Sequence, residues 1–304
     1  MNNFNFSSWY EKFKDITIPG SCIVVPEELS NFILNAKFIL PSEEEEKKMS
    51  DFEILSDSDE EIKQNIIPLK FEKKLLNLIV KFGGNVFPKF NQKAPIDAKW
   101  ININYSLLCT SCQEIYILLK ASNKILLNSD NDKNELVIKK WININPAYEF
   151  RCYVIEKKLF AISQRDVTHK YDYIQDECLK ICEETLLFFN NYLNSFPEKH
   201  YSFDIYRPCS DKIILIDINP HIPDQQSYLL FNLDDFNCSN ISSIKASYFY
   251  KSDEKNEIAF RFIQDMDNIQ LNSNTFNMLP DELLQFDQLI NIQNIKETIT
   301  KLNF

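Results

Sequence analysis

A short apolar run that ends in two oxygen-bearing side chains carries the clearest chemical pattern in this chain. Residues 213–220 read Ile-Ile-Leu-Ile-Asp-Ile-Asn-Pro, which is typical of a buried β-strand. Alternation along a strand puts Asp217 and Asn219 on one face, about 7 Å apart at Cα. The opposite face carries Ile214, Ile216 and Ile218. Because Mg²⁺ prefers oxygen ligands and completes its shell with water and phosphate oxygens, one interpretation is a magnesium site at this strand end.

A second carboxylate, Asp204, lies in residues 202–206, which read Ser-Phe-Asp-Ile-Tyr. Its neighbours are apolar, and an unpaired charge there is costly, so Asp204 needs a cation. A metal ion is one such cation. The alternative is that Asp204 and Asp217 cap strand ends or pair with arginine. Their spacing alone leaves both interpretations open.

Basic residues also lie inside apolar-rich strands, where cations are seldom buried without a reason. They are Lys139, Lys140, Arg151 and Arg165, with Lys89 in an earlier Phe-Pro-Lys-Phe run. The chain has only 3 Gly, so no glycine-rich phosphate loop can be written in it. A bound triphosphate would therefore have to be neutralised by Lys and Arg side chains. The alternative for each of them is a side chain that extends to solvent from a strand edge.

Other chemistries have weaker support. Cys109 and Cys112 form a C-x-x-C pair, which is open to three interpretations: free thiols, a redox pair, or half of a zinc site completed by Cys178 and Cys182. His221 either lines a site or lies in a solvent-exposed loop. The sequence contains no HExxH and no GxSxG, so metalloprotease and serine hydrolase activities are not supported.

The elements that must position these residues alternate between short strands and a few helices, so we predict an α+β fold. Neighbouring strands should pair mostly antiparallel. The predicted strands are 22–25, 115–121, 136–142, 150–155, 159–165, 201–206 and 213–218. The predicted helices are 72–82, 176–195 and 279–290. The first helix should bury a stripe of Leu75, Leu76, Ile79 and Val80 and end at Gly83 and Gly84.

The net charge of −11 is concentrated in one segment. Residues 42–61 hold ten acids and two lysines, hence −8, which leaves −3 for the rest of the chain. We expect a solvated loop there; the alternatives are a tail that binds a basic partner and a phosphorylation site at Ser56 and Ser58. The nearly neutral remainder has no concentrated basic stripe, so nucleic acid is not expected as a direct partner.

Composition and length narrow the class of protein. The chain has 304 residues, 44% of them apolar, which is enough to bury the core of one large domain or two lobes. No apolar run approaches the roughly 20 residues that span a bilayer, and residues 1–13 lack a signal-peptide pattern. We therefore expect a soluble, cytoplasmic protein without a membrane partner, whose 8 Cys stay reduced.

Several blocks of the chain, taken in order over residues 9–290, resemble the cell division cycle protein 123 family. This family comprises ATP-binding chaperones that assemble eukaryotic translation initiation factor 2. The blocks are residues 83–91, Ala94-Pro95, Asp97-Ala98, Trp100-Ile101 and residues 135–141, 149–152, 162–166, 203–206, 215–220, 229–231 and 259–261. The chain departs from the family pattern at Ala121, Gln92, Lys93, Asn123 and Lys139 and in residues 221–228.

The resemblance implies an ATP-grasp-like fold, with Mg-ATP held between the antiparallel sheets of two lobes. The lobes would be residues 1–122, with an acidic insert at about 42–62, and residues 123–304. It also implies roles for the residues described above. Lys89, Lys139, Arg151 and Arg165 would bind phosphate, Lys140 and Trp141 would follow the adenine, Ala94 and Asp97 would belong to the nucleotide site, and Asp204, Asp217 and Asn219 would hold Mg²⁺.

The resemblance further implies a partner. A monomer of this family would bind the gamma subunit of initiation factor 2 through that subunit's C-terminal β-barrel domain and promote joining of the alpha subunit, with slow or no ATP hydrolysis. Two other functions stay open. One is an ATP-grasp ligase that joins a carboxylate to an amine, and the other is a scaffold that binds no nucleotide.

Limited proteolysis tests the expectation for the acidic segment. Because residues 42–61 carry a charge of −8 with few apolar anchors, we expect the first cleavage there and unchanged nucleotide binding by the nicked protein. Mass spectrometry of the fragments locates the cut. Strong protection of this segment in the free protein would contradict the expectation and indicate that it packs on the basic nucleotide cleft.

Overall fold

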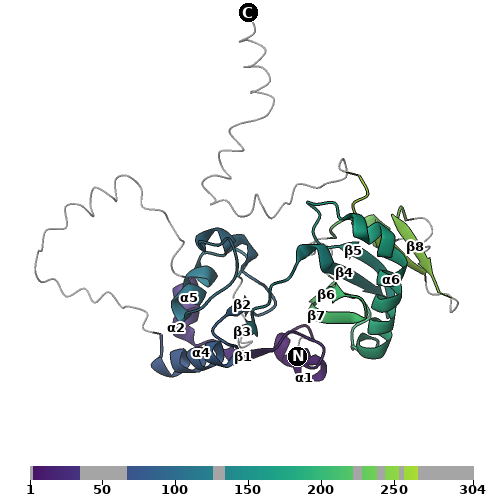
Figure 1. Ribbon diagram of the computed structural model, residues 1–304. Helices are drawn as coiled ribbons and strands as arrows, with labels where there is room; N and C mark the ends of the chain where they lie inside the picture. The colour runs from purple at the N-terminus through teal and green to yellow at the C-terminus, as the bar shows by residue number, and fades with distance from the viewer. Residues whose placement is uncertain are drawn as a thin grey trace, which may run out of the picture. The chain divides into compact units, whose positions relative to one another are not determined.

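The computed structural model describes residues 3–34, 67–125, 134–221, 228–237, 244–252 and 257–265 (Figure 1). These residues form two compact units. The first unit contains the described residues of Met1–Gly20 and Ile142–Thr275, and the second contains those of Ser21–Trp141. The division expected from the resemblance was different, with residues 1–122 in one lobe and residues 123–304 in the other. The acidic segment 42–61 and the predicted helix 279–290 lie outside the described residues.

A six-stranded sheet forms the centre of the first unit, with the strand order β7-β6-β4-β5-β9-β8. Its strands are β4 (Glu149–Ile155), β5 (Lys158–Gln164), β6 (Tyr201–Cys209), β7 (Lys212–Pro220), β8 (Tyr248–Lys251) and β9 (Glu257–Arg261). All neighbours pair antiparallel except β5 and β9, which are parallel. The four predicted strands between residues 150 and 218 are confirmed, as is their mainly antiparallel pairing.

One face of this sheet is apolar and is covered by a long helix. The helix α6 (Asp172–Phe188) continues as a π-helical turn, η3 (Phe189–Leu193), so the predicted helix 176–195 is confirmed. The ring of Phe189 stacks on that of Phe203 of β6, with centroids 6.3 Å apart. Figure 1 shows α6 lying along the sheet. Residues that point away from α6 therefore occupy the opposite face.

The N-terminal segment completes the first unit. Helix α1 (Phe6–Phe13) buries Phe6, Trp9 and Phe13, and the ring of Phe13 lies 6.4 Å from that of Phe196, just after η3. The chain then runs beside β7, where Leu215 donates its N–H to the carbonyl of residue 16 and accepts a hydrogen bond from the Thr17 hydroxyl. This contact explains why the first 20 residues belong with the second half of the chain.

The second unit is built on a three-stranded sheet with the order β1-β3-β2. Its strands are β1 (Gly20–Val24), β2 (Val86–Phe90) and β3 (Glu135–Lys140), and its helices are α2 (Glu27–Leu34), α4 (Leu69–Lys81) and α5 (Cys112–Lys120). A 3₁₀ helix, η1 (Ile96–Ile101), follows β2. Leu136 and Ile138 of β3 belong to the core shared with these helices. The α+β class predicted from the sequence is confirmed.

Two predictions for the second unit are wrong in detail. Residues 115–121 are helical, because the Ser111 hydroxyl caps the helix by accepting from the N–H of Glu114, whose carboxylate accepts from the N–H of Thr110. In α4 the buried row includes Leu75 and Ile79 but starts at Phe71. The predicted members Leu76 and Val80 are 52% and 69% exposed, since they lie on the helix face turned from the core.

The predicted end of α4 is confirmed. Gly83 and Gly84 both adopt positive φ angles, of 84° and 85°, and their N–H groups donate to the carbonyls of residues 80 and 79. No helix in the described part of the chain is long and apolar enough to cross a membrane.

Candidate functional site

Three charged residues lie side by side on the face of the six-stranded sheet that is opposite α6. Asp217 of β7 is paired in register with Asp204 of β6, which is paired with Arg151 of β4. The row continues through Ser163 of β5 to Arg261 of β9. The sequence segments that carry these residues are far apart, so the sheet brings together three residues that the sequence had singled out separately, Arg151, Asp204 and Asp217.

A β-bulge sets the direction of the side chains on β7. Asp204 pairs with Asp217 and the next residue of β6 pairs with Leu215, so Ile216 has no counterpart. Leu215 and Ile218 are consequently the buried residues, at 0% and 2% exposure, and the predicted apolar face needs correction, because a bulge breaks strict alternation. Asn219 is opposite Ser202 and therefore shares a face with Asp217, as predicted.

Arg151 neutralises the buried carboxylate of Asp204. Its Nε lies 2.7 Å from Oδ1 and its Nη2 lies 2.8 Å from Oδ2, a bidentate pair. Burial lowers the pKa of the Arg151 guanidinium, but the charge and hydrogen bonds of Asp204 outweigh burial, so the pKa is raised. Asp204 is 4% exposed and Arg151 is 8% exposed. Of the two alternatives for Asp204, the arginine pair is therefore present in this structure.

Arg165 completes the positive side of the cluster. Its Nε lies 3.8 Å from Oδ2 of Asp204 and 3.7 Å from Oε1 of Glu149. These distances are too long for hydrogen bonds, and this buried Nε makes none with any described residue. A buried N–H without an acceptor is costly. The site therefore fits an anion, such as a phosphate oxygen, that would accept from Arg165.

The residues also fit a magnesium ion. Asp204 and Asp217 lie on directly paired positions, and like charges there are unfavourable without a cation. Mg²⁺ is commonly held by one or two carboxylates plus substrate phosphates and water. In the described ranges no three or more His, Cys, Asp or Glu side chains group into an all-protein metal site. The two carboxylates with Asn219 match the phosphate-dependent kind of site.

An aromatic wall borders this cluster on the same sheet face. The Tyr153 hydroxyl donates to the carbonyl of Tyr228 at 2.8 Å, and the ring of Tyr153 packs against those of Phe231 and Phe236. Arg261 lies 4.3 Å over the Phe231 ring. The wall comes from the segment around helix α7 (Leu233–Asn237). It closes one side of the charged row.

Several of these positioning residues were not predicted as such. Strand register alone makes neighbours of the site out of Glu149, Tyr153 and Ser163. Asp235 joins them through its pairing with Arg261 at 2.7 Å. No local sequence signal identifies such long-range pairs. Arg207, 1% exposed and bound to Glu177 and Glu184 of α6, is a comparable ion pair with a structural role on the helix-covered side.

The second unit brings two predicted lysines together. Lys89 of β2 is in register with Val137, and Lys139 of β3 is in register with Phe87. The two lysines are therefore diagonal neighbours on one face of the sheet, about 7–8 Å apart at Cα. They are 5% and 1% exposed. Both lysines are therefore nearly excluded from solvent on one face of this sheet.

The other residues of this unit that the resemblance assigns to the nucleotide site differ from one another in environment. Lys140 is exposed, and the backbone N–H of Trp141 donates to the carbonyl of Asn85 at 3.0 Å. Ala94 packs against the core. The buried carboxylate of Asp97 accepts three hydrogen bonds: from the Ser122 hydroxyl at 2.6 Å and from the N–H groups of residues 123 and 124 at 2.7 and 3.2 Å. Asp97 thus holds η1 to the turn after α5.

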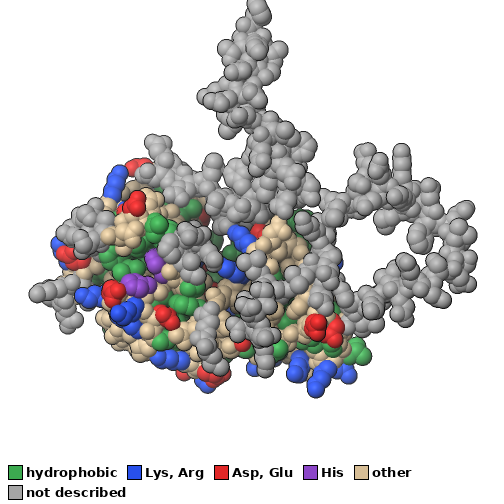
Figure 2. Space-filling view, turned by 180° about the vertical axis from the view of Figure 1, so that it is seen from behind, with side chains coloured by type: hydrophobic (Ala, Val, Ile, Leu, Met, Phe, Trp, Pro, Cys, Tyr) green, Lys and Arg blue, Asp and Glu red, His purple; other side chains and the backbone are tan. Residues whose placement is uncertain are grey.

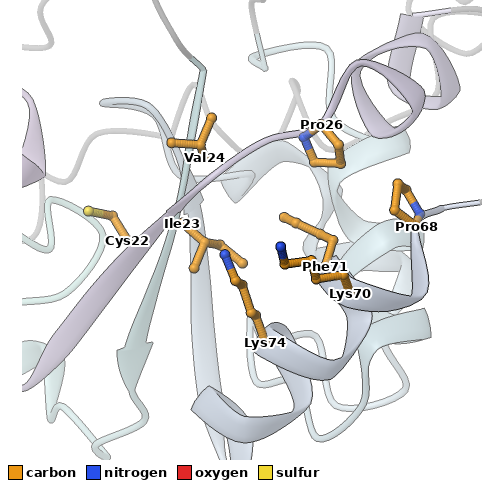
Figure 3. Close-up of a pocket in the computed structure, with 8 residues that line it drawn as sticks. All are labelled: Cys22, Ile23, Val24, Pro26, Pro68, Lys70, Phe71 and Lys74. Carbon is orange, nitrogen blue, oxygen red and sulfur yellow. The ribbon is translucent and has the colours of Figure 1, made fainter.

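The second unit also contains a cavity. A cavity of about 440 Å³ between β1 and α4 is lined by Cys22, Ile23, Val24, Pro26, Pro68, Lys70, Phe71 and Lys74 (Figure 3). None of the predicted site residues lines it.

On the face in Figure 2, basic and acidic side chains of the described residues are interspersed, unlike the continuous basic stripe of many nucleic-acid-binding proteins.

The C-x-x-C pair is part of the core rather than of this site. Cys109 is 0% and Cys112 7% exposed, and burial raises the pKa of Cys109 to about 12. A thiol with so high a pKa is a poor nucleophile. Every described cysteine is a free thiol.

A family model, curated relatives and a solved structure all show similarity of this chain to the same group of proteins. A family model described as D123 matches residues 9–287. The translation initiation factor eIF2 assembly protein of Xenopus tropicalis is 33% identical over 269 residues, covering 80% of each chain. Cell division cycle protein 123 of Yarrowia lipolytica is 36% identical over 253 residues, covering 76% of this chain and 68% of the relative. The solved structure of Cdc123 from Schizosaccharomyces pombe has a TM-score of 0.62 at 28% identity, covering 86% of this chain and 96% of that chain.

Replacement of Asp97 tests its structural role. In Asp97→Asn the side-chain N–H₂ faces the donors of residues 122–124, so we expect the free energy of unfolding to fall by about 1.5–3 kcal/mol. The exposed carboxylate of Asp172 provides the control, because Asp172→Asn should change stability by less than about 0.5 kcal/mol. Urea unfolding measures both. Unchanged stability of Asp97→Asn would contradict this role and favour direct contact with a ligand.

Proposed function

The chain belongs to the D123 family, and from that premise we propose that it is an assembly chaperone for eukaryotic translation initiation factor 2 that binds Mg-ATP. The relatives from Xenopus tropicalis and Dictyostelium discoideum are named as assembly proteins of this factor. The observation that carries the nucleotide part is the cluster of Arg151, Arg165, Asp204 and Asp217, of which Arg151 and Asp204 are buried. It has an unsatisfied donor, Nε of Arg165, for an anion and two carboxylates on paired strand positions for a cation.

In this proposal the first unit provides the metal ligands and part of the phosphate contacts. Asp204, Asp217 and Asn219 hold Mg²⁺, while Arg151 and Arg165 bind phosphate oxygens. The bidentate fork of arginine suits a phosphate as well as it suits a carboxylate. The metal, when bound, neutralises charge between the carboxylates and the triphosphate.

The second unit contributes its own residues to the proposal. Lys89 and Lys139 bind phosphate, which agrees with their burial on one sheet face. The backbone of Lys140 and Trp141 follows the adenine. Side chains replace a glycine-rich loop in this assignment, as the 3 Gly of the chain require.

The proposed partner is the gamma subunit of the initiation factor, contacted through its C-terminal β-barrel domain, and the proposed outcome is joining of the alpha subunit. Support comes from the family membership and from the mixed basic and acidic side chains on the face in Figure 2, which suit protein contact better than nucleic-acid contact. ATP acts as a structural or switching ligand with slow turnover.

Removal of one metal ligand tests the nucleotide part. Asp217→Ala should weaken Mg-ATP binding at least about tenfold, because triphosphate charge is left unneutralised beside Asp204. Glu183→Ala is the matched control, since Glu183 is an exposed acid of the same unit on α6, and it should bind like the wild type. Isothermal titration calorimetry measures the affinities. Wild-type affinity in Asp217→Ala would remove the metal assignment.

The partner part is tested with purified gamma subunit. Titration onto this protein with Mg-ATP present should give a saturable complex, and depletion of the protein from cells should lower the amount of intact alpha-beta-gamma trimer. A different outcome would favour a ligase: no complex at micromolar concentrations, together with ADP release that a small carboxylate and an amine stimulate.

A further inference from the structure

The pairing of Arg151 with Asp204 uses both oxygens of the carboxylate that the metal would need. Nε of Arg151 lies 2.7 Å from Oδ1, and Nη2 lies 2.8 Å from Oδ2. Each of the two oxygens therefore already accepts a charge-assisted hydrogen bond. A metal ion that approaches Asp204 has to compete with a guanidinium fixed in fork geometry.

The neighbours of this pair show that the Arg151 guanidinium takes the place of a metal cation. Asp217 lies on the position directly paired with Asp204, and Arg165 lies 3.8 Å from Asp204. Without Arg151, two carboxylates would face each other on adjacent strands, an arrangement that attracts a divalent ion. With Arg151 in place, much of that negative charge is already neutralised.

From this geometry we infer that Arg151 is a built-in counter-ion that keeps divalent metal off Asp204 until a triphosphate is present. The inference rests on the proposed Mg-ATP function and specifies the regulation of that same site. Metal alone offers Arg151 no anion in exchange for Asp204, and breaking a buried ion pair leaves an uncompensated charge. A triphosphate offers a second bidentate acceptor, so metal and nucleotide enter together.

A consequence is that metal affinity without nucleotide should be low in the wild type and should rise when the guanidinium is removed. Arg151→Met keeps much of the side-chain length but no charge and no donors. In that variant Asp204 loses its bidentate partner and lies on the position paired with Asp217, with Nε of Arg165 3.8 Å from its Oδ2. A divalent cation can then take the place of the lost guanidinium charge beside the two carboxylates.

The experiment measures binding of Mn²⁺, in place of Mg²⁺ and without nucleotide, by the loss of the free-ion signal in electron paramagnetic resonance. Arg151→Met should bind Mn²⁺ about 10- to 100-fold more tightly than the wild type. Adding Asp204→Asn to Arg151→Met should abolish the gain. Arg261→Met is the matched control because it breaks another bidentate arginine–aspartate pair of the same unit, with Asp235, and it should produce no gain.

Arg151→Lys provides a second variant in case Arg151→Met does not fold. It keeps the positive charge and loses the fork, so Mn²⁺ affinity should lie between those of the wild type and Arg151→Met, or simply exceed that of the wild type if only the lysine variant can be measured.

The inference is overturned if the wild type binds Mn²⁺ alone as tightly as Arg151→Met, or as Arg151→Lys where only that variant folds. It is also overturned if Arg261→Met gains as much as Arg151→Met. Calorimetry of Mg-ATP binding to the wild type separates this result from failure of the proposed function. Wild-type binding of Mg-ATP without a gain in the Arg151 variants rejects only the counter-ion, whereas no binding of Mg-ATP by the wild type rejects the nucleotide function.

Discussion

A carboxylate buried in a sheet must be paired with positive charge, and Asp204 imposes that constraint on the first unit. At 4% exposure its charge cannot be solvated by bulk water. The sheet meets the requirement by register: Arg151 on β4 lies opposite Asp204 on β6, and α6 covers only the other face. A shift of one residue in that pairing would turn Arg151 toward the apolar side, so the ion pair and the register of β4 with β6 depend on each other.

The same constraint links structure to the proposed activity. Since the chain has only 3 Gly, it has few positions for a phosphate-binding loop of backbone N–H groups, and arginine and lysine side chains take that role in the proposal. Those side chains need counter-ions when no ligand is bound. Asp204 serves Arg151 in this way, and the Arg165 Nε is left for an anion. The proposed binding site and the stability of the sheet thus depend on the same charges.

The sequence predicted the strands β4 to β7 of the first unit, because alternating apolar runs mark strands whatever their partners are, but it did not predict β8 and β9. It singled out Arg151, Asp204 and Asp217 of the charged row as well. It also predicted the family. It did not predict which carboxylate pairs with which arginine, since register depends on contacts more than 50 residues apart in sequence, such as that of Arg151 with Asp204. The bulge at Ile216 could not be predicted from the sequence either, because a bulge is defined by the pairing of two strands, here β6 and β7.

The errors in the second unit have local physical causes. Residues 115–121 are rich in apolar and aromatic side chains and read as a strand, but Ser111 and Glu114 form a helix cap, and this signal was present in the sequence. In α4 the apolar residues occupy more than one face, and periodicity alone could not tell that Phe71 faces the core while Val80 is exposed. Packing against the sheet decides between the faces.

A crystal structure with Mn²⁺ and ATP bound, with an anomalous difference map recorded at the manganese edge, tests the central claim most directly. The account predicts a peak at coordination distance, roughly 2.0–2.3 Å, from oxygens of Asp204 and Asp217, with the Arg151 guanidinium on a phosphate instead of on Asp204. A peak elsewhere, or bound metal with the bidentate pair of Arg151 and Asp204 unchanged, would contradict it.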